Sequence, residues 1–328
     1  MRPPPFEPLP ADAHSLRLRA GRDALILAGW LTVAFMFVVV MPLASSLGYD
    51  GHAYWSVDLT DIYGRAMESN WALGGFRYTP PIAFLFAPAE VLPWWLWVWL
   101  YGALLVGTMT WLGGRWTLVV LALPPMALEL YHQNVHLLMA ASIALGLRYP
   151  WAWSFAILAK VTPGVGLIWF AVRREWRNLA IALGATLAFI AVTFAFAPDA
   201  WAEWWTQIVA FSNRPAPFTA PFLPLRIGGA ALLVGWGART DRPWTVAVAA
   251  TLALPSLSPL GVILALGAIP FLRRGDRAAL APDWTTAVSL RRYVLVIGAF
   301  IGIALVLALI GSGPIRQLID DSSTQIHQ

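Results

Sequence analysis

One lysine stands inside an apolar stretch of a chain that otherwise uses arginine as its cation. The chain holds 22 basic residues, and Lys160 is the only lysine among them. Because an unpaired charge among apolar groups is costly, we expect Lys160 to face a cavity or a charged partner. Its compact ammonium suits a phosphate oxygen or a single carboxylate, whereas reaching out to the nearest water is the alternative.

Asp50 is the residue whose surroundings best suit proton transfer. It lies in the segment Gly48–Tyr54, just beyond the first long apolar run. A carboxylate close to apolar walls can have a raised pKa and act as a general base, while a solvated loop acid or a helix N-cap is the plainer interpretation. Asp58 and Asp61 follow three residues apart, and we predict that they are surface charges sharing one face of an amphipathic helix.

Arginine and tyrosine side chains elsewhere are candidates for binding a phosphate or a sugar. Arg77 and Tyr78 precede a rigid pair of prolines, and they either bind a phosphate or anchor the chain at an interface. Further substrate-binding candidates are His52, Tyr54 and Arg214, which the topology preferred below places on the same side of a membrane as Arg77 and Tyr78.

A polar turn separates two apolar runs and carries hydrogen-bonding groups. Its candidate residues are His132, Gln133, Asn134 and His136. These side chains suit a polyhydroxylated or phosphate ligand, although a simple polar turn is the alternative. We expect no metal site, because no carboxylate motif accompanies the two histidines.

The composition indicates what kind of scaffold must position these residues. Of the 328 residues, 59% are hydrophobic and 12% are charged. An ordinary soluble domain carries about 25% charged residues, so we predict an all-α, polytopic transmembrane helical bundle. Cysteine is absent, which excludes disulfides, thiolate metal ligands and cysteine nucleophiles. The arginines stand in small groups between apolar runs, as topology signals do, so we expect no nucleic-acid partner.

Apolar runs divide the chain into about 10 or 11 membrane helices, some of them short or broken. We place these runs at 24–43, 79–92, 94–112, 116–130, 134–147, 151–172, 179–197, 223–238, 244–256, 258–271 and 293–311. Residues 1–22 are expected to form a cytoplasmic tail, 23–311 a single transmembrane domain and 312–328 a tail outside. Within the domain, 44–78 is predicted as an outer loop with interfacial helices, and 198–222 as a second outer loop.

The distribution of arginines favours one topology over another. If 79–92 spans the membrane and 151–172 is a single helix, Arg115 and Arg148 both fall outside, against the positive-inside rule. If 79–92 is instead a short interfacial or re-entrant piece, and 151–172 is a hairpin broken at Thr162–Gly164, the arginines of all the short loops fall inside. We prefer the second topology, which gathers the polar candidates on the outer side of the membrane.

The order of these motifs resembles a known family of membrane enzymes. Asp50 and Tyr54 precede a Tyr-x-Pro-Pro motif at Tyr78–Pro81, a Gln-Asn-x-His turn at Gln133–His136 and a Lys-x-Thr-Pro motif at Lys160–Pro163. Over roughly residues 20–275 the chain is similar to GT-C type membrane glycosyltransferases, in particular to glycosyltransferase family 87. That family comprises polyprenyl-phosphate-mannose-dependent mannosyltransferases and related arabinofuranosyltransferases.

The resemblance implies a GT-C-like fold and an inverting transfer of a sugar from a polyprenyl-phosphate donor to a glycolipid or glycan acceptor. Of the two sugars that the family uses, we expect mannose rather than arabinofuranose. The resemblance makes Asp50 the general base on the acceptor hydroxyl and Lys160 a partner of the donor phosphate. We predict Arg77 and Tyr78 as further ligands of that phosphate, because a cation at headgroup depth can hold a phosphodiester. No cofactor and no metal is implied beyond the lipid-linked sugar. The enzyme would be a multi-pass protein of a bacterial plasma membrane, surrounded by membrane lipid, with its active site facing the periplasmic or extracellular side.

A transporter or lipid flippase is the competing interpretation. It explains broken helices and buried polar residues equally well. It also predicts an internal repeat and polar groups spread across the depth of the membrane. The sequence shows no convincing repeat, and the polar groups gather on one side in the preferred topology, so we favour the transferase.

Overall fold

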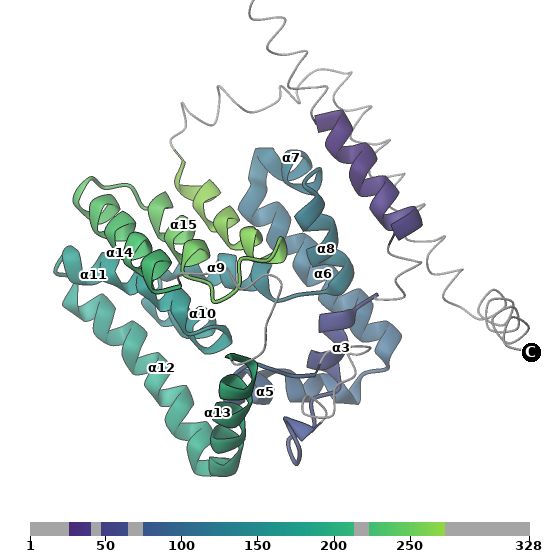
Figure 1. The fold of residues 1–328 in the computed structure, drawn as a ribbon, viewed down its shortest axis with the longest axis horizontal. Coiled ribbons are helices and arrows are strands. Elements are labelled where there is room, and N and C mark those ends of the chain that lie inside the picture. Colours follow the sequence, from purple (N-terminus) through teal and green to yellow (C-terminus); the bar gives the residue numbers. More distant parts are fainter. Residues whose placement is uncertain (1–25, 41–46, 65–74, 213–222, 273–328) are drawn as a thin grey trace, which may run out of the picture.

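The computed structural model is all-helical throughout the residues that it describes, which are 26–40, 47–64, 75–212 and 223–272. The helices pack into one bundle, with α9 and α10 at its centre and α12 along one edge (Figure 1). The prediction of an all-α bundle is therefore confirmed for these residues. The apolar run at 293–311, the tails at 1–22 and 312–328, and Arg214 lie outside the described residues.

Short connections join consecutive helices between Pro80 and Ser212. The first described helix covers Ile26–Val39 and ends in η1 (Met36–Val40). Proline occupies the first turn of both α5 and α8, where its missing N–H is not needed. The other elements are α3 (Tyr49–Trp55), α5 (Pro80–Phe86), η2 (Ala87–Val91), α6 (Trp94–Gly113), η3 (Gly114–Trp116), α7 (Thr117–Leu121), α8 (Pro124–His132), α9 (His136–Gly146), η4 (Pro150–Ala152), α10 (Trp153–Ala159), η5 (Thr162–Leu167), α11 (Ile168–Val172), α12 (Trp176–Phe196), α13 (Pro198–Ser212), α14 (Leu223–Arg239), α15 (Trp244–Leu252) and η6 (Leu260–Phe271).

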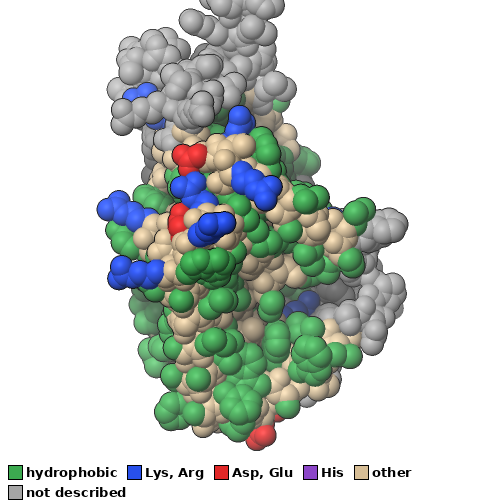
Figure 2. All heavy atoms as spheres, turned by 90° about the vertical axis from the view of Figure 1, so that its left-hand side faces the viewer, with side chains coloured by type: hydrophobic (Ala, Val, Ile, Leu, Met, Phe, Trp, Pro, Cys, Tyr) green, Lys and Arg blue, Asp and Glu red, His purple; other side chains and the backbone are tan. Residues whose placement is uncertain are grey.

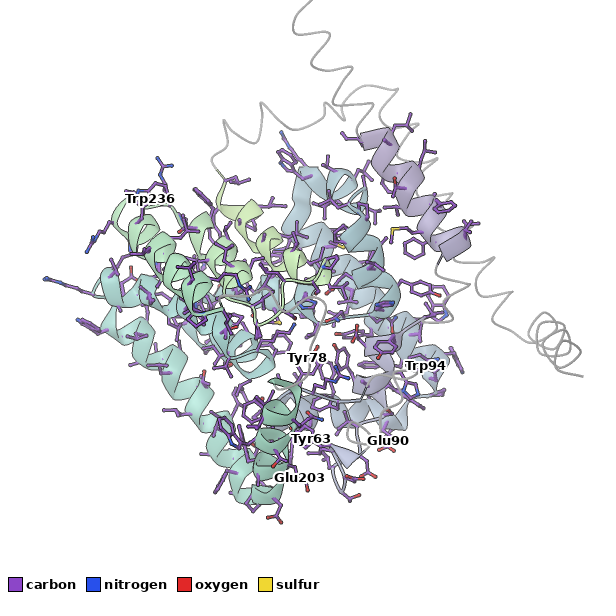
Figure 3. All side chains as sticks on the ribbon, viewed as in Figure 1. Tyr63, Tyr78, Glu90, Trp94, Glu203 and Trp236 are labelled. Carbon is purple, nitrogen blue, oxygen red and sulfur yellow. The ribbon has the colours of Figure 1, made fainter. Side chains whose placement is uncertain are left out.

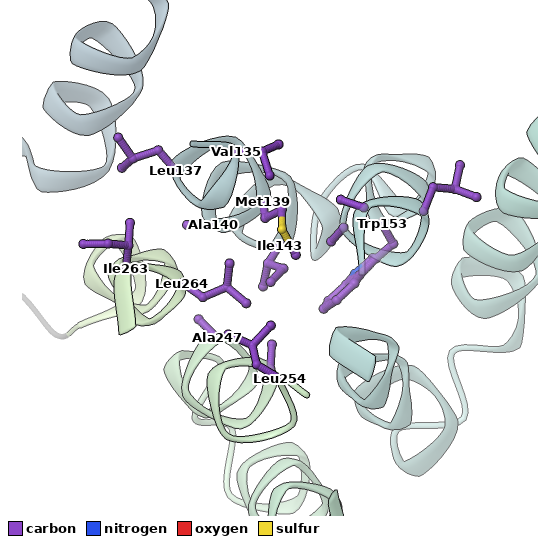
Figure 4. Close-up of a cluster of buried hydrophobic side chains, with 14 of the residues drawn as sticks. Val135, Leu137, Met139, Ala140, Ile143, Trp153, Ala247, Leu254, Ile263 and Leu264 are labelled. Carbon is purple, nitrogen blue, oxygen red and sulfur yellow. The ribbon is translucent and has the colours of Figure 1, made fainter. Parts of the chain in front are cut away.

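The chain reverses direction between α10 and η5. Figure 4 shows buried apolar side chains of α9, α15 and η6 gathered together, with the ring of Trp153 pointing towards them. Trp153, at the start of α10, is fully buried and lies against Gly146 of α9 and Gly166 of η5. A Cβ at Gly146 would stand 2.6 Å from the indole ring, so the tryptophan requires a glycine there. Further along, Ile157 lies beside Gly164, as expected for two antiparallel arms.

Two predictions about short or broken elements agree with the structure. The segment 79–92 forms only the short α5 and η2, and 151–172 is a hairpin. The break falls slightly earlier than predicted, because α10 ends at Ala159 and Lys160 adopts an extended backbone with φ −150° and ψ 121°. The interfacial or re-entrant placement of 79–92 stays a prediction.

Two other segments differ from the predictions. The run 116–130 is not one helix, since Pro124 holds the preceding residue in an extended conformation and separates α7 from α8. The segment 198–222 is not simply a loop, because α13 occupies it as far as Ser212. Pro198 starts this helix rather than preventing it, since a proline suits the first helical turn.

The predicted amphipathic helix at Asp58 and Asp61 is wrong. The Asp58 Oδ1 accepts the Thr60 N–H at 2.8 Å, and the Asp61 Oδ1 accepts the Gly64 N–H at 2.9 Å. Short acidic side chains that bond nearby backbone N–H groups stabilise turns in place of a helix. Both residues are exposed surface charges, as predicted, but in turns.

Large apolar side chains cover the outer faces of α6 and α12. On α12 the exposed residues include Ile181, Leu183, Leu187, Phe189, Val192, Phe194 and Phe196. Among the described residues, α12 and Trp94–Leu121 are long and apolar enough to cross a membrane, with only 17% and 33% of their most apolar stretches buried. A core helix of a soluble protein would be mostly buried, so this surface favours contact with lipid.

Exposed arginines border this apolar surface at one end. Figure 2 shows basic side chains gathered on the face that carries α11, α12 and α14, above a wide apolar area. The exposed basic residues at the ends of these helices are Arg173, Arg174, Arg177, Arg239 and Arg242. A group of basic side chains beside a wide apolar surface is typical of a membrane boundary.

Candidate active site

The turn between α8 and α9 holds the polar residues of the site. The helix α8 ends at His132 and is followed by Gln133, whose φ of 56° lies in the left-handed region, and the chain enters α9 at His136. The Asn134 N–H donates to the Glu129 carbonyl at 3.1 Å and closes the end of α8. Asn134 and His136 are both buried, and they reach in different directions, to Asp50 and to Lys160.

The short helix α3 carries Asp50 and is held firmly against its neighbours. The Gly48 N–H donates to the Tyr131 carbonyl at 2.8 Å, so the start of α3 is tied to the end of α8. The Trp97 indole N–H donates to the Gly51 carbonyl at 3.0 Å, which ties α3 to α6. Asp50 therefore projects from a backbone that is fixed on both sides.

Gln133 locks the same helix from the turn. Its Nε2 donates to the Val98 carbonyl at 2.7 Å, and its side chain lies against Gly51. A Cβ at Gly51 would stand 2.6 Å from the Gln133 Oε1, so the close contact depends on glycine. The geometry thus gives Gln133 a packing role, while its contact with a substrate stays a prediction.

Asn134 orients the Asp50 carboxylate directly. Its Nδ2 donates to Asp50 Oδ2 at 2.6 Å, and its Oδ1 accepts the Val135 N–H at 2.7 Å, which decides how the amide is turned. Burial raises the pKa of Asp50 to about 6, although the Asn134 hydrogen bond and the charge of Lys160 act in the opposite direction. A carboxylate that loses its proton near neutral pH is suited to act as a general base.

Lys160 lies at the tip of the hairpin and is held by the second residue of the turn. Its Nζ stands 2.9 Å from the His136 Nε2, and its side chain is half-buried. The lysine charge is close enough to lower the pKa of Asp50, yet among the described residues no ion pair joins the two. The site therefore presents a carboxylate and an ammonium that have not neutralised each other by contact.

Glu129 is a member of this cluster that the sequence analysis missed. It is fully buried on α8, where its Oε1 accepts the Leu137 N–H at 2.9 Å and its Oε2 lies 3.2 Å from the His136 Nδ1. The signal that could have revealed it is a single acid inside an apolar run, which is as costly in lipid as the lysine is.

Two tyrosines and an arginine border the carboxylate side of the site. The Tyr54 and Tyr78 hydroxyls lie 2.9 Å apart, and the Tyr63 hydroxyl donates to the Tyr78 carbonyl at 2.7 Å. Figure 3 labels Tyr63 and Tyr78 among the side chains of the bundle. Burial raises the pKa of Tyr54 and Tyr78, and the charge of Asp50 acts in the same direction, so both phenols stay protonated. Arg77 is half-buried, and its charge lowers the pKa of Asp50.

The remaining candidates lie around this centre. The His52 ring packs against Trp55 and Trp94, with ring centres 5.5 and 5.2 Å apart. The His132 ring lies 5.9 Å from the ring of Tyr49, the residue before Asp50. The contacts of these two histidines with a substrate stay predictions, as does that of Arg214.

Comparison with known proteins identifies one family. The model of glycosyltransferase family 87 matches residues 76–298, which is more than half of the chain. The matched range contains Arg77, Tyr78, the turn between α8 and α9, and Lys160, and it begins after Asp50. No curated protein and no solved structure matches this chain.

Proposed function

This chain belongs to glycosyltransferase family 87, and we propose that it transfers a sugar from a polyprenyl-phosphate donor to a glycolipid or glycan acceptor. Such a transfer needs a base for the acceptor hydroxyl and a cation for the leaving phosphate. Asp50 and Lys160 suit these two roles. We propose mannose, in preference to arabinofuranose, as the sugar, and the donor comparison described below decides between them.

The observation that carries this proposal is that one turn binds two side chains of opposite charge, Asp50 and Lys160. Asn134 holds Asp50 at 2.6 Å and His136 holds Lys160 at 2.9 Å, although the two supports are only two positions apart in one turn. A reacting sugar needs a base on the acceptor side and a cation on the leaving-group side, both fixed in advance. One rigid turn that sets both groups provides this arrangement.

In the proposed reaction, the acceptor oxygen attacks the anomeric carbon while its proton passes to the Asp50 carboxylate. The bond between that carbon and the phosphate oxygen breaks, and its electron pair leaves with the polyprenyl phosphate. The Lys160 ammonium stabilises the growing negative charge, and Arg77 and Tyr78 supply further donors. A single attack on the face opposite to the leaving group inverts the anomeric centre. The chemistry requires no cofactor beyond the donor itself.

An apolar groove on the outside of the bundle suits the prenyl chain of such a donor. Its volume of about 390 Å³ lies within the range of ligand pockets, and its walls come from α5, α9, α10 and α12. The lining residues Pro81, Leu138 and Leu158 each stand within three positions of a proposed site residue. From there the groove extends to Leu145 and Trp151, so a lipid tail could follow α9 and α10 away from the phosphate.

The polar side chains in this groove do not oppose a lipid. Ser142 and Ser154 line it, but each donates its hydroxyl to a backbone carbonyl, of Met139 and Trp151 respectively. The groove therefore offers an apolar surface to its occupant.

We also propose that the protein is a multi-pass protein of a bacterial plasma membrane, with this site on the outer side. The exposed apolar faces of α6 and α12 and the bordering arginines support it. The natural absence of cysteine permits a direct test with single cysteines at His132 and Arg174 and a membrane-impermeant thiol reagent. We expect labelling of position 132 from outside and of position 174 from the cytoplasm; labelling of 132 only from the cytoplasm would overturn the orientation.

The decisive activity test uses the purified full chain in vesicles. Polyprenyl-phosphate mannose and polyprenyl-phosphate arabinofuranose, each labelled in the sugar, are supplied with a lipid extract of acceptors. We expect label from the mannose donor to enter a new glycolipid or glycan, with release of polyprenyl phosphate. The Asp50→Asn variant serves as the inactive control. Passage of the intact donor across the bilayer, without cleavage, would instead establish the flippase.

A further inference from the structure

We propose that Glu129 is a positioning residue, which holds His136 in one tautomer and thereby aims the Lys160 ammonium at the donor phosphate. The identity of the ligand rests on the proposed function, but the hydrogen-bond chain does not. Glu129 itself touches no substrate in this scheme, because it acts through the histidine.

The three side chains form a continuous chain from the interior of the bundle to the site. Glu129 is 0% exposed and His136 is 2% exposed, whereas Lys160 is half-buried at the outer end. The Glu129 Oε2 lies 3.2 Å from His136 Nδ1, and His136 Nε2 lies 2.9 Å from Lys160 Nζ. The second carboxylate oxygen, Oε1, accepts the Leu137 N–H at 2.9 Å, so the carboxylate cannot turn away.

The proposal takes Lys160 as an ammonium and Glu129 as a carboxylate, and these two states fix the protons along the hydrogen-bond chain. A lysine ammonium has only donors, so the His136 Nε2 that faces it must be an acceptor. The neutral ring then carries its proton on Nδ1, and that N–H donates to Glu129 Oε2. A carboxylate is the group that can accept from both the ring and the Leu137 N–H. Glu129 therefore determines which ring nitrogen of His136 carries the proton.

The hydrogen-bonded series Glu129–His136–Lys160 also explains how an ammonium is kept at the position of Lys160. Buried charges are tolerated when they are paired and hydrogen-bonded. The carboxylate of Glu129 compensates the ammonium of Lys160 across a neutral imidazole, without occupying the donors of Lys160 that point away from the ring. Those donors remain available for the phosphate oxygens.

A purely structural role for Glu129 is the alternative that the test must separate. The bond to the Leu137 N–H satisfies a donor in the first turn of α9, as a helix cap does. Loss of that cap would destabilise the fold regardless of what Lys160 does. The informative variant must keep the cap and change only the group that faces the ring.

Glu129→Gln meets this requirement. Its amide oxygen can still accept the Leu137 N–H, but its NH₂ then donates to Nδ1, which forces the ring proton onto Nε2 and against the lysine. We expect the KM for polyprenyl-phosphate mannose to rise about 10- to 100-fold, the effect of losing one hydrogen bond to a charged group, with a smaller change in kcat. Glu90→Gln, at an exposed glutamate on η2, is the matched control and should leave both constants unchanged.

A double-mutant cycle distinguishes positioning from capping. If Glu129 acts through Lys160, then Glu129→Gln adds nothing to the rise in donor KM caused by Lys160→Met. Additive losses in the double variant, or an unchanged donor KM in Glu129→Gln alone, would overturn the proposal.

The tautomer can be measured without substrate. In the ¹⁵N spectrum of the histidine-labelled full chain, the His136 signals are those missing from His136→Asn. We expect protonated Nδ1 and bare Nε2, and a proton on Nε2 would refute the inference even if Glu129→Gln does not fold. If the wild-type chain transfers no sugar, the proposed function fails, while this measurement still decides the tautomer.

Discussion

The hairpin formed by α10, η5 and α11 carries charge at both of its ends, but in opposite ways. At the hairpin tip, Lys160 is half-buried and bonded to the buried His136. At the hairpin base, Arg173 is exposed and pairs with Glu175 at 2.8 Å and with Asp241 at 2.9 Å. The same helices therefore end in a fixed polar cluster on one side and in solvated ion pairs on the other.

The difference teaches which charges in this molecule are costly to change. Exposed ion pairs gain little because water and salt screen them and because their side chains lose freedom. A charge at the tip is surrounded by buried groups, and removing its partner leaves a polar atom unsatisfied. Charge at the base is thus suited to marking a membrane boundary, and charge at the tip to chemistry.

The strongest test of this contrast replaces one acid near each end of the hairpin, Asp50 near the tip and Asp241 near the base. Asp50→Asn keeps the shape and the hydrogen bonding of the side chain but removes the basic lone pair. We expect kcat to fall about 10²- to 10⁴-fold, with donor binding retained, since the loss of a general base has that magnitude. Sugar transfer in vesicles measures it. Asp241→Asn is the matched acid at the base, and an equal loss there would break the comparison.

The next test removes the cation at the tip. Lys160→Met keeps the apolar stem and deletes the ammonium, so the leaving phosphate loses its charge stabilisation. We expect kcat/KM for the donor to fall about 10²- to 10³-fold, the range for deleting one donor to a developing anion. Circular dichroism checks that the helices remain. Full activity in this variant would remove Lys160 from the mechanism.

Two asparagine–carboxylate bonds allow a matched pair of substitutions. Asn134 donates to Asp50 at 2.6 Å at the tip, and Asn178 donates to Glu175 at 2.9 Å at the base. Because a hydrogen bond to a charged group contributes about 1.5–3 kcal/mol, we expect Asn134→Ala to lower kcat/KM about 10- to 100-fold. Asn178→Ala should leave it unchanged. If both variants behave alike, the position of the bond has no bearing on activity.

The pH dependence sharpens the contrast without any substitution. Asp50 must be unprotonated to act as a base, and its pKa is raised to about 6 from an ordinary 3.8. Its proton therefore stays bound up to a higher pH, and kcat/KM should rise as pH rises through about 6, with roughly a tenfold loss for each unit below it. A rate profile from pH 4.5 to 8 measures this limb. A limb that persists in Asp50→Asn would assign it to another group.

The smallest effect is expected at the base. Arg173→Gln removes both exposed ion pairs, which are worth about 0–1 kcal/mol in the free energy of unfolding. We expect unchanged sugar transfer and a barely shifted Tm, and the neighbouring Arg174 and Arg177 keep the base positive. A large loss of activity would show that the two ends are coupled.

The sequence by itself determined the class of the molecule and its two most informative residues. Hydropathy depends only on residue type along the chain, so apolar runs reveal helices such as α6, α9 and α12 without any knowledge of their packing. Lys160 and Asp50 stood out for the same local reason, since their types are unusual in their surroundings. Breaks caused by proline are equally local, because a proline disturbs only its own helical turn. The sequence analysis did not foresee that Pro124 and Pro198 would each begin a helix, which divides 116–130 and places α13 in 198–222.

Only the tertiary structure decided which polar groups meet. Asn134 and Asp50 are 84 positions apart, and His136 and Lys160 are 24 apart, so no spacing along the chain brings either pair together. The left-handed turn at Gln133 reverses the chain between α8 and α9, and the start of α9 therefore lies beside Glu129. This reversal allows Glu129 to contact His136 and Leu137. The physical reason is the short range of the hydrogen bond, which needs atoms within about 3 Å, whereas apolar helices can pack in several registers. The registers in this bundle, with close contacts such as that of Trp153 against Gly146, bring Asp50 and Lys160 to one turn.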